Sequence, residues 1–318
     1  MKIVVLERSS VGRDVSVDKL GQFGELICYD NTKTEEIRER AKDADILVVN
    51  KSKLNAETLE GADRLRLICE FATGFDNVDL AYCKKKGITV TNCSDYSTPS
   101  VAQHTFALAL ALLENLPYYD TYVKNGTYAG QDKFSHFGVA FREMESLTWG
   151  IVGMGHIGTK VAGIAEAFGC RVIHYAVTGK RNAAKYEQVS FDELLQRSDI
   201  LSLHCPLSDL THHLIDKDAL SKMKSSAILI NVARGAVVDN AALYEALTKG
   251  EIAAAGLDVV EGEPISPDNP LSNIADSGKL IITPHMAWGS SEARGRLVTI
   301  VCDNIASYLN GTPKNVVS

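Results

Sequence analysis

The stretch that decides the fold is residues 149–158, which read WGIVGMGHIG. A short apolar run is followed at once by a G-x-G-x-x-G pattern, and residues 159–168 continue as a predicted helix. This order suits a dinucleotide loop, because Gly153 permits a tight turn, Gly155 lets the backbone approach a pyrophosphate, and Gly158 allows helix and strand to pack closely. The pattern alone also fits a plain turn, but its position between strand and helix favours nucleotide binding.

The chain on the C-terminal side of this loop alternates apolar runs with segments of helix length. The runs occupy residues 171–175, 200–203, 227–231, 253–258 and 280–282. Continuous apolar strands that alternate with helices are typical of parallel sheets covered on both faces. The sequence therefore predicts a doubly wound α/β domain in the second half of the chain.

The N-terminal part shows the same alternation on a smaller scale, with apolar runs at residues 3–6, 46–49, 67–69 and 88–90. An Ala- and Leu-rich helix is predicted from residue 99 to about residue 116, because Ser97-Thr98-Pro99 supplies a start signal. This helix marks a domain boundary, and a last helix at about residues 291–309 could return to the first domain. We therefore predict α/β architecture with two doubly wound, Rossmann-like parallel-sheet domains.

The composition is that of an ordinary folded protein. With 318 residues, of which 45% are hydrophobic and 23% charged, the chain is long enough for two domains with separate cores. The formal net charge of -7 disfavours broad attachment to nucleic acid or anionic lipid, since both are negatively charged. The apolar run at the start of the chain, residues 3–6, is far shorter than the apolar core of a signal peptide, and no segment is long enough to span a membrane. We expect a cytoplasmic protein whose partner is a small molecule, with no nucleic acid and no membrane.

Cysteine and histidine do not form recognisable metal-ligand patterns. The seven cysteines are scattered and include no C-x-x-C pair, so neither a disulfide framework nor a zinc site is indicated. The eight histidines include no H-E-x-x-H motif, and His212 and His213 are adjacent but lack partners nearby. We therefore expect reduced thiols, most of them in the cores, and no metal.

The strand at residues 171–175 should end in an acidic residue if the protein binds NAD, because a carboxylate there binds the ribose hydroxyls. Ala176 stands there instead, and Thr178, Lys180 and Arg181 follow it. One interpretation is a site for the 2′-phosphate of NADP, to which a hydroxyl and two cations would donate. The other is a solvated basic loop. Both interpretations stay open, so the expected cofactor is NAD or NADP.

Three polar residues, Arg234, Glu263 and His285, come shortly after apolar strands, at the edge where an open α/β sheet binds its ligands. An arginine at that edge is suited to clamp a carboxylate through two hydrogen bonds. Histidine is the side chain best suited to exchange a proton near neutral pH. Taken singly, Arg234 is also consistent with a residue that forms a surface ion pair, and His285 is also consistent with a histidine of purely structural role.

Seven sequence blocks occur in a fixed order around these residues. They are ATGFDNVD (72–79), YSTPSVAQHT (96–105), GMGHIG (153–158), SDILSLHCPL (198–207), NVARG (231–235), GLDVVEGEP (256–264) and TPH (283–285). Together they closely resemble the D-isomer-specific 2-hydroxyacid dehydrogenase family, over a region from about residue 45 to the C-terminus. So many ordered blocks are not expected by coincidence.

The resemblance implies an NAD(P)-dependent dehydrogenase that transfers hydride to a small 2-keto acid and forms a D-2-hydroxy acid. By position, it implies that Arg234 binds the substrate carboxylate and polarises the carbonyl, that His285 is the acid–base, and that Glu263 pairs with His285. Backbone amides near Thr73 and Gly74 would complete the carboxylate site.

The resemblance also implies cofactor contacts and a domain organisation. Asp258 would hold the nicotinamide carboxamide, and further cofactor contacts are expected at Gly153, Gly155, His156, Ile157, Gly158, Cys205, Pro206, Thr211, Val232, Ala233 and His285. The substrate domain would be flavodoxin-like, comprise residues 1–98 and 289–318, and be split around a nucleotide domain at residues 99–288. Family members usually dimerise through the nucleotide domain, so we expect a homodimer.

The segment after His285 bears on the substrate. The pattern T-P-H-x-A-W followed by E-A-R, at residues 283–294, looks most like the glycerate dehydrogenases, also called hydroxypyruvate reductases. Trp288 either fills space near the reacting carbon, which favours hydroxypyruvate or glyoxylate, or is ordinary packing. An apolar wall discriminates by only ~1–3 kcal/mol per methylene, so a D-lactate-type or broader 2-keto acid reductase is an alternative.

Two further branches share the resemblance. The family also contains a transcriptional corepressor that uses the dinucleotide fold as a redox-sensitive binding module. The retained Arg234, Glu263 and His285 do not exclude this role, but the chain has no long disordered tail for partner recruitment. A formate or phosphite dehydrogenase on the same scaffold is another alternative, but the formate enzymes carry Gln where Glu263 stands, which argues against that branch. Turnover of a 2-keto acid with reduced cofactor would separate an enzyme from a binding protein.

Overall fold

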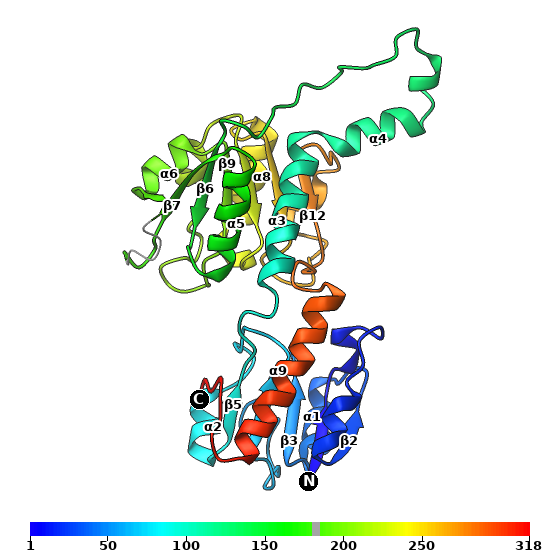
Figure 1. The fold of residues 1–318 in the computed structure, drawn as a ribbon, viewed down its shortest axis with the longest axis vertical. Coiled ribbons are helices and arrows are strands. Elements are labelled where there is room, and N and C mark those ends of the chain that lie inside the picture. The colour runs from blue at the N-terminus through cyan, green and yellow to red at the C-terminus, as the bar shows by residue number, and fades with distance from the viewer. Residues whose placement is uncertain (180–184) are drawn as a thin grey trace. The chain divides into compact units, whose positions relative to one another are not determined.

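The computed structural model describes residues 1–179 and 185–318. The chain forms two compact units, Met1–Ser97 with Trp288–Ser318, and Thr98–Ala287, both drawn in Figure 1. Each boundary lies one residue from the expected one. Both units contain a parallel sheet with helices packed on it, so the predicted fold class is confirmed.

The first unit is built on a five-stranded sheet with the order β2-β1-β3-β4-β5, which is the order of flavodoxin-like folds. Its strands are β1 (Lys2–Val5), β2 (Glu25–Cys28), β3 (Ile46–Val49), β4 (Leu67–Glu70) and β5 (Thr89–Thr91). Its helices are α1 (Thr34–Ala41), α2 (Leu80–Lys86) and α9 (Ser291–Leu309), with short 3-10 helices η1 (Arg8–Val11) and η2 (Asp18–Phe23).

Alternate side chains of the central strands enter two separate cores of this unit. Ile46 and Val48 of β3 lie in the core that also contains Leu297 of α9, whereas Leu47 and Val49 lie in the core on the other face. This follows from the two-residue period of a strand, which points successive side chains to opposite faces. The C-terminal helix α9 therefore covers one face of the first unit, which combines residues from both ends of the chain.

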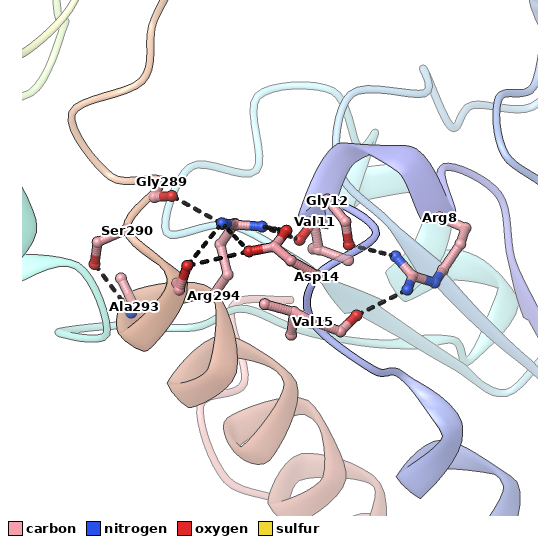
Figure 2. A network of polar contacts seen from close by, with 10 residues as sticks. Arg8, Val11, Gly12, Asp14, Val15, Gly289, Ser290, Ala293 and Arg294 are labelled. Carbon is pink, nitrogen blue, oxygen red and sulfur yellow. Dashed lines mark hydrogen bonds and ion pairs between the residues drawn. The ribbon is translucent and has the colours of Figure 1, made fainter.

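The start of α9 is fastened to the segment between β1 and β2, as Figure 2 shows. Arg294 donates two hydrogen bonds to the carboxylate of Asp14, at 2.6 and 2.8 Å, and a third to the carbonyl of Val11 at 2.8 Å. The hydroxyl of Ser290 caps the helix by accepting from the backbone N–H of Ala293 at 3.2 Å. Hydrogen bonding to the Arg294 guanidinium holds the pKa of Asp14 well below its usual range.

The second unit is built on a seven-stranded parallel sheet with the order β12-β11-β10-β9-β6-β7-β8. Its strands are β6 (Thr148–Val152), β7 (Arg171–Tyr175), β8 (Glu187–Gln188), β9 (Ile200–Leu203), β10 (Ile228–Asn231), β11 (Ala254–Leu257) and β12 (Leu280–Ile282). Its helices are α3 (Thr98–Leu113), α4 (Leu116–Lys124), α5 (His156–Ala167), α6 (Phe191–Arg197), α7 (Lys217–Lys222) and α8 (Asn240–Lys249), with 3-10 helices η3 (Tyr128–Gly130), η4 (Gly235–Val237) and η5 (Pro270–Asn273). The strand order reverses beside β6, as in dinucleotide-binding sheets.

Strand β6, which leads into the glycine loop, is firmly packed in this sheet. Trp149 is fully buried, packs against Phe106 of α3 in a tilted arrangement with ring centroids 4.6 Å apart, and donates from Nε1 to the hydroxyl of Ser202 at 2.8 Å. An offset aromatic pair contributes about 0.5–1.5 kcal/mol beyond the buried area. The glycine loop therefore begins from a rigid support.

The structure differs from the sequence expectation at several elements. The strands β2 and β8 were not predicted, because β2 keeps its side chains half exposed and β8 is only two residues long. Helix α3 ends at Leu113, earlier than expected, since Asn115 takes a left-handed conformation with φ of 53° and turns the chain into α4. In Figure 1, α4 and the segment after it project from the body of their unit.

The structure bears on two expectations drawn from the sequence, one about the cysteines and one about membrane spans. All seven cysteines are free thiols, and six of them are buried. Within the two ranges that the structure describes, no helix combines the length and the apolar character that a membrane span requires.

Candidate active site

His285 lies three residues beyond β12, at the carboxyl edge of the second unit's sheet. Its backbone is left-handed with φ of 54°, a conformation that costs a non-glycine residue about 1–3 kcal/mol and is often stored at functional sites. The Nδ1 atom lies 2.6 Å from Oε2 of Glu263. Because Glu263 is an acceptor, Nδ1 carries the proton of this bond and Nε2 is the nitrogen left for another molecule. Both side chains are about one third exposed, 27% and 34%, so the pair is open to a ligand.

A buried aspartate holds the loop that carries His285. Asp258 directly follows β11, is 1% exposed, and accepts hydrogen bonds from the hydroxyl of Thr283 at 2.6 Å and from the backbone N–H groups of Met286 and Ala287 at 2.9 and 2.8 Å. The ring of His104 in α3 lies 2.9 Å from the Thr283 hydroxyl and extends this network. Sequence analysis missed this positioning role of Asp258 and the contribution of His104. The predicted contact of Asp258 with nicotinamide stays a prediction.

Glu263 is held by the turn that follows β11. Its Oε1 accepts from the backbone N–H of Val260 at 3.2 Å, so the carboxylate uses one oxygen for the loop and the other for His285. Gly235 lies directly against this turn, because a Cβ added to it would meet the carbonyl of Val260 at 2.0 Å and the nitrogen of Glu261 at 2.5 Å. Only glycine allows the segment after β10 and the Glu263 loop to approach so closely.

Arg234 precedes Gly235 and follows β10, the neighbour of β11 in the sheet. Its side chain is half buried and donates from Nη1 to the carbonyl of Ala233 at 2.9 Å. Within the described residues its guanidinium makes no ion pair with a carboxylate, so the surface ion pair that its position also allowed is not observed. Arg234, Glu263 and His285 thus follow three adjacent strands at one edge, which is suited to a carboxylate ligand and proton transfer.

The glycine loop has the shape that a pyrophosphate requires. Gly153 has φ of 92°, and a Cβ there would meet the backbone of His204 and Cys205 at 2.9 Å. A Cβ at Gly158 would meet the carbonyl of Gly153 at 2.1 Å, whereas above Gly155, the N-cap of α5, nothing lies within 4 Å. The space above Gly155 at the start of α5, which His156 and Ile157 continue, together with the positive end of the helix dipole, fits a dinucleotide pyrophosphate.

The remaining predicted cofactor residues of this unit lie at the same carboxyl edge. Val232 and Ala233 follow β10, and Cys205 and Pro206 follow β9. The side chain of Thr211 is 1% exposed and donates to the carbonyl of Pro206 at 2.7 Å, which closes the loop between them. Thr211 therefore shapes this loop through its hydroxyl.

The structure shows part of the segment after β7. Ala176 begins a turn in which the N–H of Gly179 donates to the Ala176 carbonyl at 2.9 Å, and Thr178 is exposed on that turn. The predicted 2′-phosphate residues Lys180 and Arg181 lie outside the described residues.

The predicted substrate residues Thr73, Gly74 and Trp288 belong to the first unit. Thr73 follows β4 and donates from its hydroxyl to the carbonyl of Cys93 at 2.7 Å, which fixes the loop that Gly74 continues. Trp288 is partly buried against the core of this unit and meets the ring of Tyr96 edge-on, with centroids 6.2 Å apart. This packing supports a structural role for Trp288, and its contact with substrate stays a prediction.

A histidine pair that the sequence left without partners has one in the structure. Oε2 of Glu261 lies 3.1 Å from Nε2 of His213, and the ring of His212 stacks on that of His213. The expectation that this pair lacks a nearby partner is therefore wrong. Glu261 lies far away in sequence, and only the fold brings it to the histidines.

Comparison with known families gives a match for the second unit. Residues 106–287 match the model of the D-isomer specific 2-hydroxyacid dehydrogenase, NAD binding domain. The chain is 37% identical to the hydroxypyruvate reductase of Blautia hydrogenotrophica over 100% of both chains. It is 39% identical to the glycerate dehydrogenase of Methylorubrum extorquens, over 99% of this chain and 98% of the relative.

Solved structures agree with these sequence matches. A D-lactate dehydrogenase from Aquifex aeolicus complexed with NAD and lactic acid has a TM-score of 0.84 and 34% identity, over 98% of this chain and 96% of that chain. An acyclic imino acid reductase in complex with NADPH and D-Arg has a TM-score of 0.87 and 32% identity, over 100% of both chains. The likeness thus extends over both units of the fold, and the two structures contain different nicotinamide cofactors.

Proposed function

The chain belongs to the D-isomer specific 2-hydroxyacid dehydrogenase family and is an oxidoreductase acting on 2-keto acids, and from this premise we propose that it reduces hydroxypyruvate or glyoxylate. The observation that carries the proposal is the His285–Glu263 pair, beside an arginine that has no internal carboxylate partner in the described part of the chain. A 2-keto acid offers the two groups that such a set recognises, a carboxylate and a carbonyl oxygen that needs a proton.

Each side chain then has one task in the reduction. The guanidinium of Arg234 binds the carboxylate and stabilises the negative charge that develops on the carbonyl oxygen. His285 donates a proton from Nε2 to that oxygen, while Glu263 holds the ring through Nδ1. Asp258 positions His285 through the backbone of the following residues. The nicotinamide cofactor, when bound at the glycine loop and the start of α5, supplies the hydride.

The substrate assignment draws on the relatives and on residues 283–294. Two of the relatives carry the names hydroxypyruvate reductase and glycerate dehydrogenase. The T-P-H-x-A-W pattern with E-A-R at residues 283–294 favours the same branch. Steady-state oxidation of NADH or NADPH in the presence of hydroxypyruvate or glyoxylate tests the assignment, and no turnover of either acid with either cofactor would contradict it.

We further propose that the protein accepts NADPH. The residue after β7 is Ala176, so no carboxylate stands where it would repel a 2′-phosphate. The exposed hydroxyl of Thr178 and the sequence positions Lys180 and Arg181 provide donors for that phosphate.

A homodimer is proposed from the arm formed by α4 and residues 125–142. Three phenylalanine rings of this arm are largely exposed: Phe134 by 93%, Phe137 by 84% and Phe141 by 52%. So many solvent-exposed aromatic rings close together in the chain are unusual for a surface that contacts only water. The arm has an ordered internal stack, in which the rings of Tyr122 and His136 lie 3.8 Å apart and nearly parallel. We propose that a second copy covers these rings. Light scattering should give twice the chain mass for the protein and a lower mass after the double substitution Phe134→Ser and Phe137→Ser, whereas a monomeric wild type would contradict the proposal.

The cysteines support a proposal on location. Because all seven are free and six are buried, the fold uses them as packing groups and gains nothing from oxidation. This pattern suits a reducing compartment such as the cytoplasm. Fractionation of cells that produce the tag-free protein tests this, and recovery only from an oxidising compartment would contradict it.

A further inference from the structure

The side chains of His212, His213 and Glu261 converge at the surface of the second unit, in a cluster that includes neither His285 nor Glu263. One ligand atom from each lies within 4.8 Å of the others. Nε2 of His213 is 3.1 Å from Oε2 of Glu261, and the two imidazole rings stack with centroids 4.1 Å apart. None of the three takes part in the reaction described above.

We propose that these three residues form a binding site for a divalent transition metal ion of the Zn²⁺ class. Two imidazole nitrogens and one carboxylate oxygen are the donors that Zn²⁺ prefers, whereas Mg²⁺ and Ca²⁺ prefer sets made of oxygen alone. Bonds of about 2.0–2.2 Å in tetrahedral geometry place ligand atoms roughly 3.4 Å apart. The His213–Glu261 pair, at 3.1 Å, is close to that spacing, and a ligand atom of the exposed His212 lies within 4.8 Å of both. Water would complete the coordination at the exposed side.

The backbone around the cluster holds the ligands in place without a metal. The N–H groups of His213 and Ile215 donate to the carbonyls of Ala236 and Val237 at 2.8 and 3.0 Å. The turn that carries Glu261 is pressed against Gly235, as described above. Both ligand-bearing segments are therefore fastened to the same stretch after β10, which lowers the ordering cost of metal binding.

A bound ion would add a direct link between these two segments. One of them continues from Glu261 to Glu263 within two residues, and the other follows the loop closed by Thr211. Because the ion binds the folded arrangement and not the unfolded chain, it would raise the midpoint of thermal unfolding. This effect is independent of substrate turnover, so it can be tested whether or not the proposed function holds.

The test measures Zn²⁺ binding to the tag-free, full-length protein by competition with a chromophoric chelator, together with thermal unfolding in Zn²⁺ or Mg²⁺. We expect one Zn²⁺ per chain at this site, a higher unfolding midpoint in Zn²⁺ but not in Mg²⁺, and affinity reduced at least about tenfold in His213→Ala and in Glu261→Gln. Glu251→Gln removes a carboxylate of the same unit outside the cluster and is the matched control that should keep the affinity.

The catalytic pair also offers an imidazole and a carboxylate, so His285→Asn separates the two locations. Retained Zn²⁺ affinity in His285→Asn, with loss in His213→Ala, is the expected result. Unchanged affinity in both His213→Ala and Glu261→Gln would overturn the proposal. Loss of binding in His285→Asn alone would also overturn it, because the ion would then occupy the catalytic pair.

Discussion

The ring nitrogen Nδ1 of His285 lies 2.6 Å from Oε2 of Glu263, and this contact decides which nitrogen of the ring is presented to a substrate. The two residues come from loops after neighbouring strands, β12 and β11, and backbone N–H groups of these loops, at Val260 and Ala287, donate to the carboxylates of Glu263 and Asp258. The carboxyl edge of the sheet therefore positions the pair, and substitutions of these two side chains test its role in proton transfer without disturbing the fold.

Replacing Glu263 by Gln keeps the shape of the side chain and removes its charge. We expect kcat for keto-acid reduction to fall, because the imidazolium that donates the proton loses its anionic partner. The fall should be smaller than the ~10²–10⁴-fold that acid–base catalysis contributes in total, since the amide oxygen still accepts from Nδ1. Glu251→Gln is the matched control, because Glu251 precedes β11 and lies at the opposite edge of the sheet. Equal kcat in wild type and Glu263→Gln would show that the charge has no role.

Replacing Arg234 by Ala should reduce kcat/KM by about 10²–10³-fold or more, because the substrate carboxylate and the developing charge lose the same partner. Arg234→Lys should recover a fraction of this, since Lys restores the charge but not the two-point geometry. The thermal midpoint should change little, as the only hydrogen bond of the Arg234 side chain in the described residues is to Ala233. A kcat/KM near that of wild type in Arg234→Ala would refute the assigned role.

Introducing Ala176→Asp places a carboxylate after β7, where it would bind the ribose hydroxyls and repel a 2′-phosphate. We expect the ratio of kcat/KM for NADPH to that for NADH to fall. Ala176→Asn has nearly the same shape without the charge, so it should leave the ratio much closer to the wild-type value. If the wild type uses NADH and shows no measurable NADPH activity, Lys180 and Arg181 do not serve a 2′-phosphate, and the interpretation of their segment as a solvated basic loop is the correct one.

Glu70 at the end of β4 predicts a pH dependence of stability. Its side chain is fully buried, Oε1 accepts from Asn77 at 3.0 Å, and Oε2 has no partner among the described residues. Burial raises the pKa of Glu70 well above 4.5, so the folded state keeps a proton that the unfolded state releases. This contribution to stability is fully present below pH 4.5 and is lost as the pH rises through the folded pKa.

The variant Glu70→Gln cannot ionise, so its unfolding midpoint should fall less than that of wild type between pH 5 and pH 8 (~3 pH units). Thermal unfolding at both pH values measures this difference. The exposed Glu57→Gln, in the same unit, should behave like wild type. Parallel pH profiles for wild type and Glu70→Gln would mean that Glu70 is not protonated in the fold.

Local patterns predicted those features that depend on nearby residues in the chain. The glycine loop was predicted because Gly153, Gly155 and Gly158 satisfy a strand, turn and helix within ten residues. Strand β2 was missed because it lies at a sheet edge with half-exposed side chains, which weakens the apolar signal.

Side-chain contacts between residues that are far apart in the sequence were not predicted. The link from His104 to the His285 loop joins residues 179 positions apart, and the His213–Glu261 contact spans 48. No periodicity encodes such contacts, since they arise only when parallel strands bring their carboxyl ends to one edge. The family resemblance indicated roles for Arg234, Glu263 and His285, but it did not indicate that Asp258 anchors the loop that carries His285.

The most direct test of the central claim is a comparison of kcat/KM for hydroxypyruvate, glyoxylate, pyruvate, 2-ketoisocaproate and phenylpyruvate, each with NADH and with NADPH. We predict the highest values for hydroxypyruvate or glyoxylate and lower values as the side chain grows, by roughly 1–3 kcal/mol for each poorly fitting group. Pyruvate should be accepted less well than these two acids. A clear preference for 2-ketoisocaproate or phenylpyruvate would contradict the assignment of a short, polar substrate to this site.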